Sequence, residues 1–143
     1  MAKIFRVHVK KPIEFMDAVL RAYAGETRLS LEGDLAALGH DPWPGAGRDE
    51  TAVLKRSTIS PRQDFLVVPL GPETVPALLS LMHRIGLRRN VWHLQIEKDG
   101  QLCFGAYDCF DQHCVWVQAA FGDDRLASLK ERGVVASYAA DEA

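Results

Sequence analysis

Cysteine is scarce in this sequence. The 143 residues include three cysteines, an odd number without the regular spacing of a disulfide-bonded scaffold: Cys103, Cys109 and Cys114. A chain of this length buries roughly 68–70% of its unfolded surface and needs neither disulfides nor a metal to fold. The cysteine content therefore excludes a small disulfide-rich secreted domain and predicts a reducing, cytoplasmic location.

Long apolar runs and a large net charge are also missing. No stretch approaches the roughly 18 apolar residues of a membrane span, and the first residues, MAKIFRVHVKK, alternate instead of forming the apolar run of a secretion signal. The net charge is −2, which provides no general attraction for nucleic acid or for a membrane surface. We therefore expect a soluble chain with no membrane and no nucleic-acid partner.

The common catalytic and cofactor signatures are absent as well. Gly33-Asp34, Gly71-Pro72 and Gly122-Asp123 each precede a predicted helix, but none belongs to a phosphate-loop or dinucleotide-binding motif. The chain also lacks a Gly-x-Ser-x-Gly elbow and a His-Glu-x-x-His motif. These absences predict no bound cofactor and favour a protein without catalytic activity.

The clearest structural signal that is present is a β-hairpin pattern over residues 91–107. Apolar and polar residues alternate on both sides of Asp99-Gly100, a typical turn dipeptide. A two-residue loop would place apolar side chains opposite polar ones, whereas a three-residue loop over 98–100, with Gly100 left-handed in a bulge, leaves one face wholly apolar. We therefore predict the second register, which pairs Ile96 with Leu102 and Leu94 with Phe104.

The remaining elements follow from periodicity. Helical spacing predicts three main helices and one short helical piece, over residues 12–23, 74–85, 122–132 and 34–38. Alternation predicts strands over residues 3–10, 27–32, 114–117 and 134–138, and a second hairpin from 51–57 and 64–70. Because Phe65 to Val68 are all apolar, the strand 64–70 is expected at the centre of the sheet.

These elements predict a single α+β domain over residues 1–143. We expect a two-layer sandwich in which a mainly antiparallel, mixed sheet carries about three helices on one face. Residues 39–50 contain two prolines and three glycines and are expected to form a surface loop, and residues 139–143 a frayed tail. The uncovered face of the sheet is expected to be polar and to carry Arg6, His8, His93, Gln95, Glu97 and Tyr107.

The densest group of reactive side chains follows this first hairpin, in the sequence YDCFDQHC from Tyr107 to Cys114. One hypothesis is a small hydrolase or transferase with general acid–base or nucleophilic chemistry at the end of the hairpin, using His93, Tyr107, Asp108 and His113. Another is a metal site, whose weak candidate ligands are Cys109, His113 and Cys114, although no second pair of ligands exists. The structural alternative is a turn fixed by the side chains of Asp108 and Asp111.

Charge and aromatic residues favour a protein partner instead. Residues 91–143 contain nine acidic residues against four basic ones, so an acidic surface would speed the capture of a basic partner. Candidate contacts are Trp43, which lies between two prolines in the 39–50 loop, and Asp108 and Asp111. A basic cluster, His83, Arg84, Arg88 and Arg89, is too small for a nucleic-acid surface and suits the end of a helix.

The sequence thus carries two hypotheses. The favoured one is protein–protein binding of the immunity, antitoxin or adaptor kind, an analogy of size and charge. Separately, the sequence is compatible with homodimerisation through the hairpin or an edge strand. The alternative is the small hydrolase or transferase. They differ in whether the reactive side chains converge in a cleft.

Overall fold

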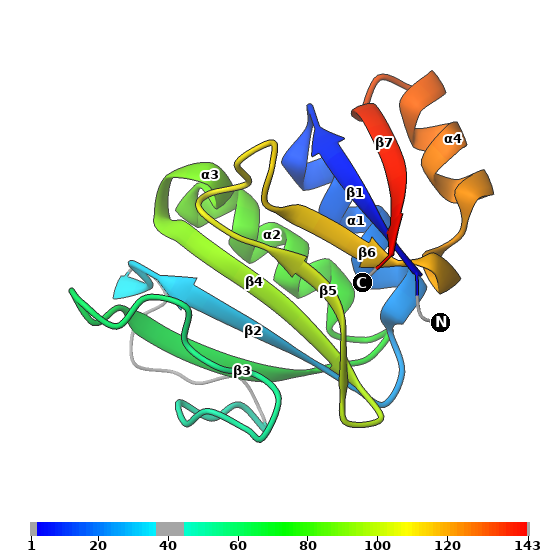
Figure 1. Ribbon diagram of the computed structural model, residues 1–143. Coiled ribbons are helices and arrows are strands. Elements are labelled where there is room, and N and C mark those ends of the chain that lie inside the picture. The colour runs from blue at the N-terminus through cyan, green and yellow to red at the C-terminus, as the bar shows by residue number, and fades with distance from the viewer. Residues whose placement is uncertain (1–2, 37–44, 143) are drawn as a thin grey trace.

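The computed structural model describes residues 3–36 and 45–142. Its centre is one seven-stranded antiparallel sheet with the strand order β3-β2-β4-β5-β6-β1-β7 (Figure 1). The strands are β1 (Lys3–Val9), β2 (Thr27–Gly33), β3 (Asp64–Leu70), β4 (Val91–Lys98), β5 (Gln101–Ala106), β6 (Val115–Gln118) and β7 (Val135–Glu142). The predicted α+β class and antiparallel sheet are confirmed, and every strand pair in the described part of the chain is antiparallel.

Helices cover one face of the sheet. They are α1 (Pro12–Tyr23), α2 (Val75–Ile85), the single turn α3 (Leu87–Asn90) and α4 (Asp123–Glu131), with a 3-10 turn η2 (Ala119–Phe121) before α4. Figure 1 shows α1, α2 and α3 behind the strands and α4 beside β7. Among the described residues, no helix combines the length and the apolar character needed to cross a membrane.

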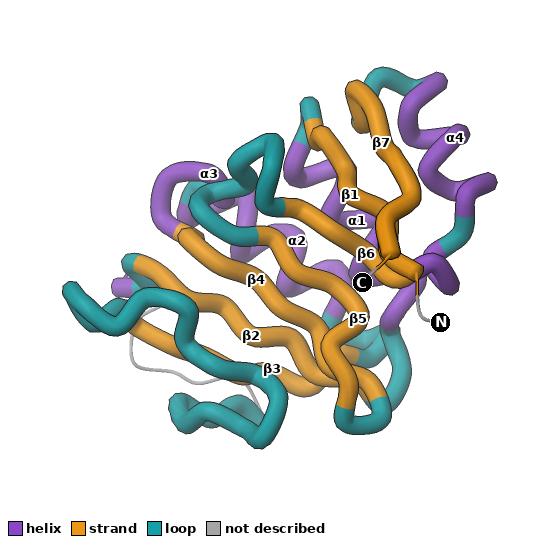
Figure 2. The backbone as a smooth tube through the Cα atoms, in the orientation of Figure 1, coloured by secondary structure: helices purple, strands orange, loops and turns teal. Residues whose placement is uncertain are grey.

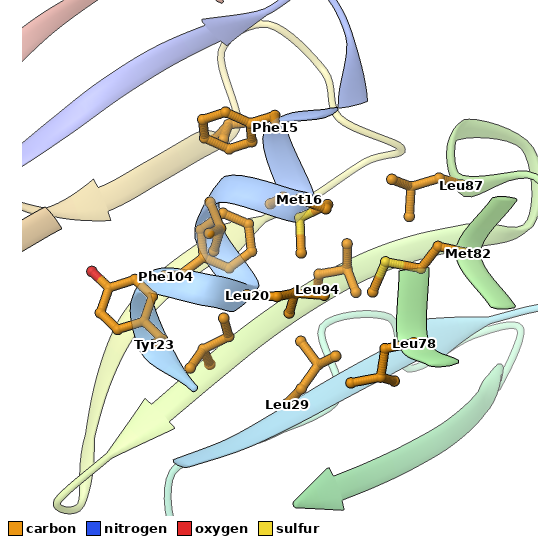
Figure 3. Close-up of a cluster of buried hydrophobic side chains, with 14 of the residues drawn as sticks. Phe15, Met16, Leu20, Tyr23, Leu29, Leu78, Met82, Leu87, Leu94 and Phe104 are labelled. Atoms are coloured by element: carbon orange, nitrogen blue, oxygen red, sulfur yellow. The ribbon is translucent and has the colours of Figure 1, made fainter. Parts of the chain in front are cut away.

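The core lies between α1, α2 and the sheet, and it follows the predicted helical stripes. Pro12 stands at the first turn of α1, where a missing N–H costs nothing, and the bounds of this helix are those predicted. Figure 3 shows Phe15, Met16 and Leu20 of α1 facing Leu94 and Phe104 of the sheet. In α2 the helical spacing predicts a buried stripe, and the structure confirms four of its five members and replaces half-buried Leu79 by buried Leu81; the predicted set is Val75, Leu78, Leu79, Met82 and Ile85.

The hairpin of β4 and β5 exists, but its predicted register is wrong. Lys98 pairs with Gln101 across a two-residue loop in which Asp99 and Gly100 both have positive φ, 51° and 76°. A β-bulge then shifts the ladder, so that Ile96 pairs with Phe104 and Leu94 with Ala106. The extra residue, Cys103, restores the apolar face that a regular two-residue hairpin would have lost.

The predicted second hairpin is also wrong. Residues 51–57 form no strand, and β3 pairs with β2 from Asp64 opposite Gly33 to Leu70 opposite Thr27. The strand β3 is therefore at one edge of the sheet and not at its centre. Its consecutive apolar residues are nonetheless buried on both faces, because Phe65 and Val67 pack against Leu54 on the side away from the helices.

The predicted frayed tail is wrong as well. Residues 139–142 continue β7 and pair with β1 from Arg6 opposite Ala139 to Lys3 opposite Glu142. Residues 37–44 and 143 lie outside the described residues, and with them Trp43, the first half of the predicted loop 39–50 and the end of the predicted helical piece 34–38.

Candidate functional site

The sheet face that points away from α1 and α2 is divided into two halves. Residues 45–63, here called the strap, cross this face over β3 and β2 (Figure 2). Strap residues also contact β4, since the side chain of Gln95 exchanges hydrogen bonds with Lys55. The half formed by β3, β2, β4 and β5 is here called the covered half. The half formed by β6, β1 and β7 is called the open half.

The side chain of Glu32 attaches the strap to the sheet. Glu32 is 2% exposed, and its two carboxylate oxygens accept the backbone N–H groups of Ser57 (2.7 Å) and Thr58 (3.1 Å). Gln95 makes a similar paired contact, in which its amide oxygen accepts the N–H of Lys55 and its amide nitrogen donates to the Lys55 carbonyl, both at 3.3 Å. These buried polar groups are thus satisfied by the strap's backbone.

His93 is held by both ring nitrogens. The backbone N–H of Asp108 donates to His93 Nδ1 (3.2 Å), so the neutral ring carries its proton on Nε2. That Nε2–H then donates to the hydroxyl of Thr58, 2.7 Å away on the strap. Because one nitrogen already accepts a hydrogen bond and the other already donates one, this arrangement disfavours His93 as a general base.

Tyr107 lies beside His93, with ring centroids 5.7 Å apart. Gln95 donates to its hydroxyl at 3.3 Å. Burial raises the pKa of Tyr107 above its ordinary value, and hydrogen bonds from Gln95 and Trp116 only partly offset that rise, so the phenol stays protonated at neutral pH. The rings of Tyr107 and Trp116 meet over Gly105, where a Cβ would stand 2.5 Å from the indole nitrogen and 2.9 Å from the phenol oxygen.

A left-handed turn follows Tyr107. Asp108, Cys109 and Phe110 have φ values of 54°, 57° and 62°, an arrangement that costs non-glycine residues roughly 1–2 kcal/mol each. Buried Phe110 anchors this turn, and the N–H of Cys109 donates to the Trp92 carbonyl. Asp111 closes it by accepting the N–H of His113, so the structural role considered for Asp111 is present.

The proposed catalytic residues do not meet in one cleft. His93 and Tyr107 are neighbours, but Asp108 approaches His93 only through its backbone, and its carboxylate lies 3.7 Å from Cys114 Sγ. His113 is exposed at the open half. The hollows between α1 and α4, beside residues 45–51, over β1 and β7, and around α3 are not lined by His93 or Tyr107.

Metal and thiol chemistry find little support at this turn. Within residues 3–36 and 45–142, no group of three or more His, Cys, Asp or Glu side chains is arranged to hold a metal ion. Burial and the nearby Asp108 raise the pKa of Cys109; burial and the carboxylates of Asp108 and Asp111 raise the pKa of Cys114. Both thiols therefore remain protonated at neutral pH, which disfavours them as nucleophiles.

The open half presents side chains to solvent around a shallow hollow of about 560 Å³. Arg6 and His8 of β1 and Ser137 and Ala139 of β7 line this hollow together with Gln112 and His113 of the turn. Arg6 is 57% exposed and pairs with Asp141 at 2.6 Å. The predicted polar face is thus present, but its members are separated, because Arg6 and His8 lie in the open half and His93 and Gln95 under the strap.

Sequence reasoning missed the strap and its anchors. Alternation over residues 27–32 places Glu32 on the polar side of its strand with Arg28 and Ser30, yet nothing in the local pattern indicates that Ser57 and Thr58 cover it. The basic cluster lies at the end of α2 and in α3. His83 and Arg84 occupy the last turn of α2, as the interpretation from the helix dipole expects.

Comparison of the chain with models of protein families, with curated proteins and with solved structures found no match.

Proposed function

We propose that this chain acts by binding another protein through the open half of its sheet, without catalysis, in the manner of an adaptor or immunity-type protein. The observation that carries the proposal is the difference between the two halves of one face. Under the strap, the polar side chains of Glu32, His93 and Gln95 bind the chain's own backbone and side chains. Over β6, β1 and β7, comparable side chains face solvent.

The composition of the open half suits a protein surface. Half-buried Ile4 and Trp116 lie among polar groups that include Arg6 and His8, and tryptophan and arginine are the residue types that most often dominate binding energy at protein interfaces. An interface that mixes apolar and polar surface area is typical of complexes that form and dissociate reversibly. Such a partner would contact the exposed side chains of the open half directly, so its binding would not require a pocket.

The turn at the rim of the open half adds negative charge. Asp108 and Asp111 are exposed, and the neighbouring residues Gln112 and His113 line the hollow. An acidic rim raises the association rate of a basic partner and makes that rate fall with added salt. The proposal therefore keeps the protein partner and its basic character. It also keeps the cytoplasmic location, which suits three free cysteines.

The hydrolase or transferase alternative is less well supported by this geometry. It needs His93 to exchange a proton, but Nδ1 and Nε2 are both engaged in internal hydrogen bonds. It also needs His113 near His93, whereas His113 lies in the hollow with Arg6 and His8. A partner surface requires no such convergence.

Site-specific photo-crosslinking in living cells tests the proposal. A photoreactive amino acid replaces Ser137 or His8 in the open half, and matched variants carry it at the exposed positions Ser80 of α2 and Ala127 of α4. We expect one discrete adduct from the open half and none from the controls. The adduct should form again with the purified partner and disappear when Arg6→Glu and Trp116→Ala are combined.

Two results would contradict this proposal. Equal adducts from open-half and control positions would mean that the open half is not a specific surface. Adducts that persist in the Arg6→Glu, Trp116→Ala double variant would mean that these side chains do not bind. A variant with His93→Asn that loses a measured enzymatic turnover while keeping its fold would support the alternative instead.

A further inference from the structure

The two edges of the sheet differ in how they are protected. A long edge strand with unpaired N–H and C=O groups is a template for another strand, and proteins usually block it with proline, charge or a covering segment. The β3 edge is blocked in two of these ways. It contains Pro69, and the backbone of Val67 exchanges two hydrogen bonds, of 2.9 and 2.8 Å, with Gly47 of the strap.

The β7 edge has neither a proline nor a covering strand among the described residues, and its charged residues, Asp141 and Glu142, stand at its very end. Its eight residues, VASYAADE, include no proline and no lysine or arginine, and alanines and a serine make up half of them. No segment of the described chain pairs with its outer side, since its ladder is with β1 alone. The helix α4 packs on β7 from the helical side, where the Tyr138 hydroxyl donates to Asp123.

The outward backbone groups of β7 can be assigned from the ladder. The N–H of Lys10 donates to the Val134 carbonyl, so even-numbered residues of β1 direct their backbone groups toward β7. Their partners Ser137, Ala139 and Asp141 therefore use their backbone groups inside the sheet. The N–H and C=O groups of Tyr138 and Ala140 point outward.

Charged side chains gather at both ends of this edge. Lys10 and Lys11 both donate their N–H groups to Val134, which places these exposed lysines at the start of β7, near exposed Arg132. The other end of the strand carries Asp141, which pairs with Arg6 of β1 at 2.6 Å. When two copies of β7 run antiparallel, the basic end of each lies beside the Asp141 end of the other, whereas a parallel arrangement would place the two basic ends together.

We infer that β7 pairs with the β7 strand of a second copy, antiparallel about a two-fold axis, and joins two seven-stranded sheets into one. The second copy fits because antiparallel pairing keeps the two basic ends apart and because most side chains along the edge are small. This pairing uses the edge of the sheet and not the face assigned to the protein partner, so it stands independently of the proposed function. The dimer would place the two open halves next to each other.

Sedimentation equilibrium of the purified full chain over a wide concentration range tests the pairing. We expect a reversible monomer–dimer equilibrium that weakens with added salt. Ala140→Pro removes an outward N–H that the fold itself does not use, and should raise the dissociation constant at least tenfold without changing the circular dichroism spectrum. The double variant Lys10→Glu, Lys11→Glu should weaken the dimer similarly, whereas Arg88→Glu, Arg89→Glu on α3 should leave it unchanged.

Amide hydrogen exchange tests the same inference without any substitution. The N–H groups of Tyr138 and Ala140 should exchange quickly in the dilute monomer and slowly at high concentration, while those of Ser137 and Ala139 should be slow at both. A chain that remains monomeric throughout overturns the inference. A dimer that survives both Ala140→Pro and the lysine reversal, with no change in exchange along β7, overturns it as well.

Discussion

The covered and open halves of the sheet begin from the same sequence pattern and end in different environments. In β4, His93 and Gln95 alternate with Leu94 and Ile96, just as Arg6 and His8 alternate with Phe5 and Val7 in β1. Yet His93 and Gln95 are each 5% exposed, and Arg6 is 57% exposed. The difference teaches that alternation identifies the two faces of a strand but does not reveal whether a face meets solvent.

The difference also separates structural polar groups from available ones. Burying a polar side chain without a partner costs a few kcal/mol, so those under the strap must be bound internally. Side chains in the open half bear no such requirement, and substitution there should hardly affect folding. The two halves therefore respond differently to mutation, and the following four predictions test that contrast.

The largest effect is expected at Glu32. Glu32→Ala removes the acceptor for the Ser57 and Thr58 N–H groups and leaves both near a buried face, which should cost about 3–5 kcal/mol of unfolding free energy. Urea denaturation measures this loss. Glu131→Ala, at an exposed position of α4, is the matched control and should change stability by less than about 0.5 kcal/mol. Equal effects of the two variants would remove the basis for treating Glu32 as an anchor.

The second effect concerns the apolar contact under the strap. Leu54 is fully buried with Phe65 and Val67, and Leu54→Ala should destabilise the chain by about 2–3 kcal/mol, at the lower end of the usual range because a small cluster can partly collapse. Ile59, in the same strap, is 89% exposed, so Ile59→Ala should be neutral. Limited proteolysis should cut the Leu54→Ala strap faster than the wild-type strap. No difference between the two variants would mean that the strap is not attached.

The third effect is a pH dependence at Tyr107. Tyr107→Phe removes the hydrogen bonds of the hydroxyl and should cost about 1 kcal/mol at neutral pH. Because the folded-state pKa lies above the ordinary value of 10.0, the protonated phenol contributes stability that is fully present below pH 10 and is lost as pH rises through the folded pKa. Thermal unfolding followed between neutral and alkaline pH should therefore show that raising the pH lowers the stability of Tyr107→Phe less than that of the wild type. An identical loss in both would exclude Tyr107 as its source.

The smallest effect is expected in the open half. His8→Ala and Ser137→Ala remove side chains that line the hollow on the solvent side, and each should change the unfolding free energy by less than about 0.5 kcal/mol. The same urea titrations provide the comparison with Glu32→Ala. A large loss at His8 or Ser137 would show that the open half is structural too, and the contrast between the halves would disappear.

Local features of the fold were predictable from sequence, whereas pairings between distant residues were not. The helix α1 was predicted because the Pro12 start and the spacing of Met16, Val19, Leu20 and Tyr23 are local signals, although Phe15 is buried where Ile13 was expected. The hairpin register failed because the bulge at Cys103 is set by packing across the sheet. The frayed tail failed because β7 is completed by β1, more than 100 residues away in the chain.

The candidate site shows the same limit. Its residue types were identified, and two of them, His93 and Tyr107, do lie side by side. Thr58 of the strap accepts the Nε2–H of His93, and Gln95, which is bound to Lys55, donates to the Tyr107 hydroxyl, so groups that catalysis would use are engaged in hydrogen bonds within the chain. The contacts between the strap and the strands β2 and β4 produce no periodic pattern in the sequence, so periodicity could not predict them.

By itself the sequence determined the class of the fold, the positions of its main helices and most of its strands, because these follow from side-chain periodicity and turn chemistry within short stretches. Only the tertiary structure decided the order of the strands, the placement of the strap and the fate of each polar side chain. These three features depend on which segments of the chain bury each other. A buried hydrogen bond such as that between Glu32 and Ser57 is favourable only after the fold has brought the two residues together.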